Sequence, residues 1–414
     1  MKPLLRDGRL VRLAAAALLA QLLAAVGGLL GTLATLGEQA GALSDTGLYY
    51  RYASEVLSGA WPYRDFRIEY PPLALPFFLL PRLFTADRLL YALIFGFLMF
   101  LLHGATVVLV AGAVRSSVGA EATMRRLVWY TVCFCLLCPL PVARYDVLPA
   151  LLCTASVLAW RDGWGVKGSV LAGIGALVKV FPAVVEALGV LGELQQRRRM
   201  LLRSAGAFTA TLAAGILFWL ALGGQEGVMG SVRFQTGRGL EVGSLYAGAF
   251  LLASKTGVTE TSLTYNGSAW HVGSAWSGWI GDATVLMQVA ALAMVCRRYW
   301  TTGGAGFVRW AAAAVVAVVV TSKVLSPQFL LWILPLVALI EGKPGDAARK
   351  VFLLCCGVTT LVFPWLFTGL VRREFLPIVL LNLRNALLLG LLLLLLVYPR
   401  LAPSATSASR RGSA

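Results

Sequence analysis

The feature that most constrains this chain is a series of apolar runs separated by short segments rich in Lys and Arg. A helix needs about 20 apolar residues to cross the hydrocarbon core of a bilayer. The runs therefore predict an all-α polytopic membrane protein with about 12 transmembrane helices, although the shorter runs can also be re-entrant. The runs cover residues 9–36, 88–114, 127–143, 146–160, 168–179, 182–194, 200–222, 279–296, 306–322, 327–341, 350–370 and 376–398.

Composition excludes the other classes of protein. Of the 414 residues, 58% are hydrophobic and 13% are charged, whereas an ordinary soluble protein has about 25% charged residues. A soluble enzyme, a disordered protein and a fibrous protein are therefore excluded. Much of the net charge of +17 comes from the short segments between apolar runs. This distribution is typical of cytoplasmic loops, so we expect no nucleic-acid partner.

Charge also predicts the orientation of the helices. With the N-terminus inside, twelve crossings place most basic segments, including Arg197-Arg198-Arg199, on the cytoplasmic side of the plasma membrane, as the positive-inside rule requires. Both termini are then cytoplasmic. The exceptions, which fall on the outer side, are Arg82, Arg88 and Arg372-Arg373.

The first outer loop is predicted to return to the membrane. We expect residues 48–58 to form a helix on the membrane surface and residues 72–84 to dip into it, because closely spaced prolines disfavour a straight deep helix there. A full crossing would move every later loop to the other side, so the topology of 70–88 stays open. The expected parts are one multi-spanning domain (1–401), outer loops at 37–87 and 223–278, and a disordered cytoplasmic tail (402–414).

Ionisable residues stand at the outer ends of several apolar runs. A charge at membrane depth is costly, so each one needs a reason. Lys179 and Lys323 are each flanked by apolar residues and followed by a proline. Either side chain can extend to the interface, but an anionic partner such as a lipid phosphate also explains two cations on the outer side. The other residues of this kind are Asp45, Arg144 and Asp146.

Together with their neighbours, these residues form motifs that occur in one order along the chain. The motifs are Asp45-x3-Tyr49, Gly59-Ala60-Trp61-Pro62-Tyr63-Arg64-Asp65-Phe66, Glu69-Tyr70-Pro71-Pro72-Leu73, Arg144-x-Asp146, Lys179-x2-Pro182, Gly237-Arg238-Gly239-Leu240-Glu241-x2-Ser244 and Ser322-Lys323-x2-Ser326-Pro327-Gln328-Phe329-Leu330-Leu331-Trp332. Over about residues 45–335 the chain resembles glycosyltransferase family 87. These are the polyprenyl-phosphate-mannose-dependent mannosyltransferases of the GT-C superfamily. Each motif alone is weak, and together they identify no particular acceptor.

The resemblance implies a fold of GT-C type and a mechanism. Such enzymes move a sugar from a polyprenyl phosphate to an acceptor on the outer face, and Asp45 matches the position of their base. A carboxylate there removes the proton of the acceptor hydroxyl while the sugar passes through an oxocarbenium-like state. Cations stabilise the departing phosphate, and our candidates are Arg144, Lys179, Arg238 and Lys323. One displacement inverts the anomeric centre.

Other roles are open for the acidic residues of the first outer loop. Asp45 can instead cap the helix that follows it, because Asp is a good N-cap residue. Asp65 and Glu69 are alternative bases, or partners of Arg64 and Arg67.

Two of the remaining candidates, Arg238 and His271, have two interpretations each. Asp146 is expected to orient Arg144 through an ion pair. Arg238 binds phosphate or sugar, or else pairs with Glu241. His271 contacts the sugar or assists proton transfer, or else is a surface histidine. The supporting candidates also include Tyr70 and Gln328, whereas His103, inside an apolar run, is expected to be a packing residue with a satisfied ring.

The predicted function is a membrane glycosyltransferase that uses a polyprenyl-phosphate sugar, most simply mannose, and an envelope lipid or glycan acceptor. No closely spaced acidic pair and no nucleotide-binding loop occur, so we expect no metal, no cofactor and no nucleotide sugar. The alternative is a polytopic lipid or solute transporter or flippase. Transporters often have matching halves, which this sequence lacks. A third hypothesis is a non-catalytic assembly partner in the cell envelope.

Overall fold

The computed structural model describes residues 8–36, 44–196 and 200–397. The predicted tail at 402–414 and the arginine triplet at 197–199 lie outside the described residues. The helices are α2 (Gly8–Leu36), α3 (Thr46–Leu57), η2 (Pro72–Ala74), α4 (Leu75–Arg82), α5 (Arg88–Val118), α6 (Ala120–Leu137), α7 (Leu140–Ala143), α8 (Val147–Arg161), α9 (Gly165–Val178), α10 (Ala183–Gln195), α11 (Leu201–Thr236), α12 (Leu245–Lys255), α13 (Ser277–Thr301), α14 (Phe307–Thr321), η3 (Pro327–Phe329), α15 (Leu330–Leu339), α16 (Gly342–Thr360), η4 (Leu361–Trp365), α17 (Phe367–Val371) and α18 (Phe375–Val397).

The chain is an all-α polytopic membrane protein, and every predicted apolar run contains a helix, although 127–143 divides into α6 and α7, and 350–370 into α16, η4 and α17. Within the described ranges, six helical segments are long and apolar enough to cross a membrane: Gly8–Gly31, Arg88–Val118, Leu201–Thr236, Ser277–Thr301, Gly342–Trp365 and Phe375–Val397. The shorter runs form inner helices. All ten residues of α15 are buried, and α14 is buried over most of its length. A helix that is apolar on every side is suited to such a central position.

The first outer loop contains the two helical segments that the sequence predicted. The helix predicted at 48–58 is α3, and it buries Tyr49, Tyr52 and Ala53 against the rest of the protein. The segment predicted to dip forms η2 and α4, which pack with α3 and α5. Proline at the start of both short helices is compatible with helix geometry, since the first turn needs no donor there.

The segment 223–278, predicted as a second long outer loop, begins as helix, because α11 continues through these residues to Thr236. A kink at Gly224 (φ 61°, ψ −171°) redirects the helix, and this backbone conformation is suited only to glycine. A Cβ on Gly223 would overlap the Cβ of Tyr63. The extension therefore packs closely on the first outer loop.

A small antiparallel sheet, which the sequence analysis did not predict, follows α11. Its strands are β1 (Leu240–Glu241), β2 (Ser262–Asn266) and β3 (Ala269–Gly273), in the order β1-β3-β2. Gly267 and Ser268 join β2 to β3 with φ of 56° and 60°, the two positive values that a type I′ hairpin turn requires. The Gly267-Ser268 pair between the two strands was the signal that could have predicted this hairpin.

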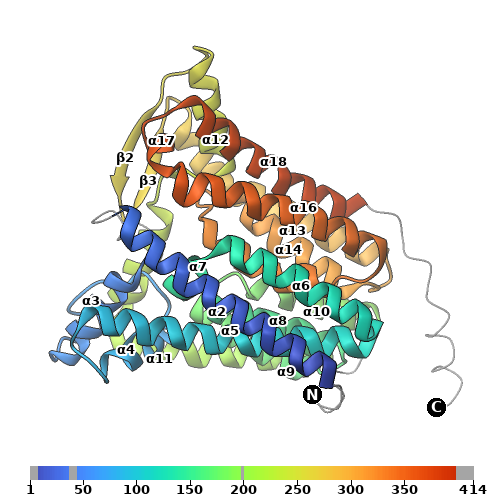
Figure 1. The fold of residues 1–414 in the computed structure, drawn as a ribbon. Coiled ribbons are helices and arrows are strands. Elements are labelled where there is room, and N and C mark those ends of the chain that lie inside the picture. The colour runs from blue at the N-terminus through green and yellow to red at the C-terminus, as the bar shows by residue number, and fades with distance from the viewer. Residues whose placement is uncertain (1–7, 37–43, 197–199, 398–414) are drawn as a thin grey trace, which may run out of the picture.

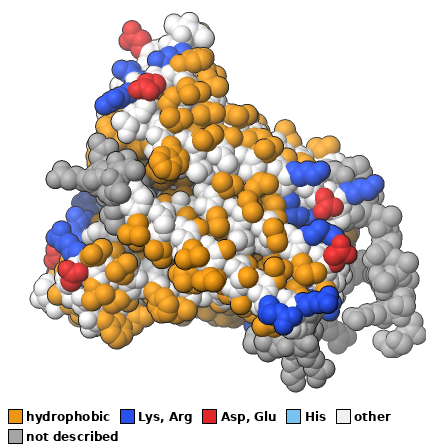
Figure 2. Space-filling model, in the orientation of Figure 1, with side chains coloured by type: hydrophobic (Ala, Val, Ile, Leu, Met, Phe, Trp, Pro, Cys, Tyr) orange, Lys and Arg blue, Asp and Glu red, His pale blue; other side chains and the backbone are white. Residues whose placement is uncertain are grey.

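The elements that carry the candidate residues gather at one end of the helix bundle. Figure 1 shows α3, α4, β2 and β3 at that end, whereas the start of α2 and the end of α18 lie at the other. On the face seen in Figure 2, hydrophobic side chains cover the middle, and Lys, Arg, Asp and Glu side chains lie toward the ends. This distribution is typical of a protein surrounded by lipid.

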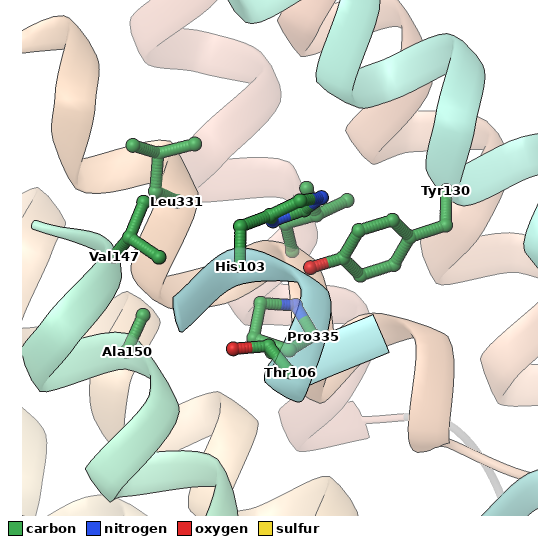
Figure 3. A pocket seen from close by; sticks show the side chains of 8 residues that line it. His103, Thr106, Tyr130, Val147, Ala150, Leu331 and Pro335 are labelled. Carbon is green, nitrogen blue, oxygen red and sulfur yellow. The ribbon is translucent and has the colours of Figure 1, made fainter. Parts of the chain in front are cut away.

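A small cavity lies inside the bundle, away from the candidate residues. Its lining includes His103, Thr106 and Tyr130 (Figure 3), and its volume of about 10 Å³ is near the room that one water molecule needs. The buried His103 ring exchanges a hydrogen bond of 2.9 Å with Gln21. The prediction of a satisfied packing histidine is therefore confirmed.

Candidate functional site

Asp45 lies at the start of α3, directed toward another segment. It occupies the N-cap position, yet its side chain makes no capping hydrogen bond. Its carboxylate instead forms an ion pair with Arg144 and accepts a hydrogen bond of 3.3 Å from the hydroxyl of Tyr49. The side chains of Asp45 and Arg144 are 16% and 12% exposed. The carboxylate is therefore fixed by tertiary contacts, and the alternative of a helix cap is not supported.

A second ion pair lies close by, between Asp146 and Lys179. The Nζ atom of Lys179 is 2.7 Å from Oδ1 of Asp146, whose side chain is 1% exposed. The indole N–H of Trp332, on α15, donates to the same oxygen at 2.7 Å. The expected ion pair of Arg144 with Asp146 is therefore wrong. Asp146 begins α8 and is held by residues from α15 and the end of α9, which leaves Arg144 to pair with Asp45.

Aromatic rings surround the ammonium group of Lys179. Its Nζ atom lies 4.8 Å from the ring centre of Tyr145, 5.0 Å from that of Trp332 and 5.2 Å from that of Phe329. Each ring face attracts a cation, and the attraction grows when water is excluded. Lys179 is therefore held at a defined point although its side chain is partly exposed.

Tyr70, one of the supporting candidates, belongs to an aromatic cluster beside Asp45. The Tyr49 ring stacks on Phe78 with centres 4.2 Å apart and an interplanar angle of 3°. Tyr70 and Tyr145 make an edge contact at 5.0 Å. Such packing of large rings restricts their motion, so the cluster holds the first outer loop against Tyr145, which lies between Arg144 and Asp146 in the chain.

Glu69 shares the electrostatic environment of these groups. Burial and the charge of Asp45 raise the pKa of Glu69 to about 7, while Arg238 and Lys179 oppose the rise. A carboxyl group with this pKa exchanges its proton near neutral pH, which suits a general base. Two carboxylates from the first outer loop therefore lie within electrostatic reach of each other and of cations from later segments.

Arg238 and Lys323 extend the group of cations. Arg238 follows α11, and its Nε atom is buried without a hydrogen-bond partner. Lys323 donates a hydrogen bond of 2.6 Å to the carbonyl of Thr236. Burial lowers the pKa of Lys323, Asp282 opposes this, and the charge of Arg238 lowers it further. The two cations therefore lie close enough to repel each other, and an anion between them would relieve that repulsion.

Glu241 fixes the loop that carries Lys323. One of its carboxylate oxygens accepts the backbone N–H of Leu325 at 3.0 Å, and its own N–H donates to the carbonyl of Lys323 at 2.9 Å. In the described part of the chain Glu241 forms no salt bridge with Arg238, although burial raises the pKa of Glu241 and the charge of Arg238 opposes that rise. The structure therefore does not support the alternative in which Arg238 forms an ion pair with Glu241.

Arg384 supports the same loop and was missed by the sequence analysis. It lies in the spanning helix α18, is 3% exposed and donates a hydrogen bond of 2.7 Å to the carbonyl of Gly243. Its charge also acts on Glu241. The available signal was a single arginine within the apolar run 376–398, since a charge at that depth needs a partner.

Three predicted residues stand apart from the ion pairs. Asp65 is exposed, pairs with Arg64 at 2.9 Å and accepts the N–H of Trp61; these contacts, the hydrogen bond from Arg64 first, lower its pKa. His271 is buried on β3, with Nε2 at 3.0 Å from the carbonyl of Asn266, so the surface alternative is wrong. Burial lowers the pKa of His271. Gln328, the third of these residues, is buried in η3.

Comparison with known proteins gives limited information. No protein-family model matches the chain, and no curated protein matches it. A solved structure of ArnT from Cupriavidus metallidurans bound to undecaprenyl phosphate is similar over 94% of this chain and 77% of that chain, with 14% identity and a TM-score of 0.47. The same protein in the apo state gives 16% identity, coverage of 94% and 76%, and a TM-score of 0.41.

Proposed function

We propose that this chain is a membrane glycosyltransferase of GT-C type. It moves mannose from a polyprenyl-phosphate donor to an envelope lipid or glycan acceptor, with inversion, on the outer face of the plasma membrane. One observation carries the proposal: the carboxylates of Asp45 and Glu69 lie among the cations Arg144, Lys179 and Arg238 at one end of the bundle. A base next to cations is what transfer from a phosphate leaving group requires.

The cations have separate tasks in this proposal. Lys179, held between aromatic rings and Asp146, presents its charge at a defined position. Arg238 has a buried Nε–H group that is free to donate to a ligand oxygen. Together with Lys323, these groups stabilise the charge that develops on the lipid phosphate as the bond to C1 of the sugar breaks. The polyprenyl chain stays in the surrounding lipid.

The carboxylates supply the base. Asp45 accepts the proton of the acceptor hydroxyl, and Arg144 keeps its carboxylate oriented. Glu69 is the second candidate, because its pKa of about 7 is matched to neutral pH. Asp65 is not proposed for this role, since its carboxylate is engaged at the surface by Arg64 and Trp61.

We propose that no metal takes part. In residues 8–36, 44–196 and 200–397, no three His, Cys, Asp or Glu side chains gather in a way that could hold a metal ion. Transfer is therefore expected to continue in excess EDTA. Loss of transfer in EDTA that returns with Mg²⁺ or Mn²⁺ would contradict this part of the proposal.

The test is transfer from radiolabelled polyprenyl-phosphate-mannose in membranes that contain the protein. We compare the wild type with Asp45→Asn and Glu69→Gln, and use Asp65→Asn as the matched control from the same loop. Loss of transfer in Asp45→Asn alone, at equal protein level, supports Asp45 as base. Loss of transfer in Glu69→Gln alone indicates that Glu69 is the base. No transfer by the wild type to any envelope acceptor, from this or other lipid-linked sugars, contradicts the proposed enzyme.

A further inference from the structure

The orientation predicted from charge places Arg82 and Arg88 on the outer side, which the positive-inside rule disfavours. The proposed reaction does not use them. Arg82 ends α4, and Arg88 begins α5. Their guanidinium carbons lie 5.3 Å and 5.5 Å from the centre of one ring, that of Tyr50. Two like charges at one ring repel each other, and the ring compensates only part of that repulsion.

The arrangement is held by hydrogen bonds that leave the charges unneutralised. Nε of Arg82 donates to the hydroxyl of Ser54 at 3.1 Å, and Nη1 donates to the carbonyl of Thr85 at 3.1 Å. The hydroxyl of Tyr50 donates to the carbonyl of Ala86 at 2.6 Å. None of these partners is an anion. Among the residues that the structure describes, neither Arg82 nor Arg88 forms an ion pair with a carboxylate.

Large apolar side chains are exposed next to the two arginines. Leu83 and Phe84, which directly follow Arg82, are 64% and 71% exposed. A surface that combines exposed apolar groups with arginine at its edge fits the boundary between the acyl chains and the headgroups of a bilayer. The exposed apolar side chains around the pair are Leu80, Leu83, Phe84, Leu89, Leu90 and Leu93.

We propose that Arg82, Arg88 and Tyr50 form a binding site for an anionic phospholipid of the leaflet at this end of the bundle. The lipid phosphate accepts charge-assisted hydrogen bonds from both guanidinium groups, for which arginine is well suited. The acyl chains lie along the exposed leucines at the start of α5. None of these three residues belongs to the proposed reaction site, so the inference stands independently of the glycosyltransferase proposal.

The test measures lipid binding to the purified full-length protein in detergent by native mass spectrometry. The probes are phosphatidylglycerol and phosphatidylcholine with identical acyl chains, titrated separately. We expect the wild type to retain one phosphatidylglycerol about tenfold more tightly than phosphatidylcholine, since only the former keeps a net negative charge for the arginine pair. Equal retention of the two lipids by the wild type would overturn the proposal.

Variants distinguish the pair from general surface charge. Arg82→Gln with Arg88→Gln should remove the preference, and Arg82→Lys with Arg88→Lys should keep part of it. Arg88→Gln alone leaves the hydrogen bonds of Arg82 intact and should weaken binding about threefold, so it tests the site even where the double variant misfolds. Arg51→Gln, an exposed arginine on α3 that contacts Tyr52 instead, should bind as the wild type does. An undiminished preference in Arg88→Gln and in the folded double variant would overturn the proposal, as would displacement of the lipid by inorganic phosphate.

Discussion

Asp45 and Arg144, which stand 99 positions apart in the chain, form an ion pair between the start of α3 and the end of α7. The pair connects the first outer loop to the helix bundle. Both side chains are largely buried, so each charge depends on the other for compensation. Arg144 therefore positions the candidate base Asp45, although the sequence analysis expected Arg144 to pair with Asp146.

The first prediction concerns this pair. Arg144→Gln leaves the Asp45 carboxylate buried without its cation, and breaking a buried pair from one side typically costs about 3–5 kcal/mol. We expect a lower melting temperature in detergent and a fall in kcat of about 100-fold or more, since the proposed base loses the cation that orients it. Combining Arg144→Gln with Asp45→Asn should restore part of the stability and none of the transfer. A double variant no more stable than Arg144→Gln would contradict the pairing.

The second prediction concerns pH. The folded-state pKa of Glu69 is about 7, above its ordinary value of 4.5. The folded protein therefore holds a proton that the unfolded chain has released between these two values. Its stability should fall as pH rises from about 4.5 to 7 and then level off, by at most about 3 kcal/mol. Glu69→Gln should flatten this part of the melting-temperature profile.

The same substitution separates the two candidate bases. If Glu69 is the base, transfer by the wild type rises through pH 7, and Glu69→Gln loses both the rise and the activity. If Asp45 is the base, Glu69→Gln keeps substantial activity, and Asp45→Asn does not. Asp65→Asn serves as the control in both measurements, because that carboxylate is exposed and outside the group of cations.

The third prediction concerns the support of Lys179. Trp332→Phe keeps an aromatic ring between Phe181 and Phe329 but removes the indole N–H that donates to Asp146. The loss of one hydrogen bond to a charged group should cost about 1.5–3 kcal/mol. We expect KM for the lipid donor to rise more than kcat falls, because Lys179 becomes less well oriented. Trp310→Phe is the matched control, since that indole donates to the carbonyl of Ala305 instead. Equal effects of the two substitutions on KM would contradict a role for Trp332 at the site.

Sequence reasoning predicted the helices well and the contacts between segments poorly. Apolar runs such as 306–322 and 327–341 identify α14 and α15, because hydrophobicity alone decides where a membrane helix forms. The continuation of α11 beyond residue 222 was not predicted, since Gly223 and Gly224 indicate a break as readily as a kink. Polar residues follow Gly224, so the hydropathy signal ends before the helix does.

The candidate site shows the same limit. The sequence identified four charged residues at the outer ends of apolar runs as candidates, because charge near the membrane is costly. They are Asp45, Arg144, Asp146 and Lys179. Their pairing depends on how α7, α8 and α9 pack, which spacing along the chain does not encode. Arg144 and Asp146 are two positions apart, yet each finds its partner in another segment.

The last prediction concerns Arg384, which acts on the site from a distance. It donates to the carbonyl of Gly243 and lies beside the buried Glu241, whose carboxylate holds the loop of Lys323. A Cβ on Gly243 would lie 3.3 Å from Nη2 of Arg384 and 3.1 Å from Oε2 of Glu241, so both side chains pack against this glycine. Arg384→Met removes the hydrogen bond to Gly243 and a charge that opposes the raised pKa of Glu241. We expect a loss of about 1.5–3 kcal/mol, as for a hydrogen bond to a charged group, together with a higher KM for the lipid donor.

Adding Glu241→Gln to Arg384→Met should recover much of the stability, because an amide needs no neutralising cation and still accepts the N–H of Leu325. The melting temperatures of the two single variants and the double variant form a cycle that measures the coupling. A positioning role predicts that the double variant also regains the wild-type KM, since Lys323 is again held by its loop. Additive losses of stability and an unchanged KM in all three variants would show that Arg384 and Glu241 act separately and that neither positions Lys323.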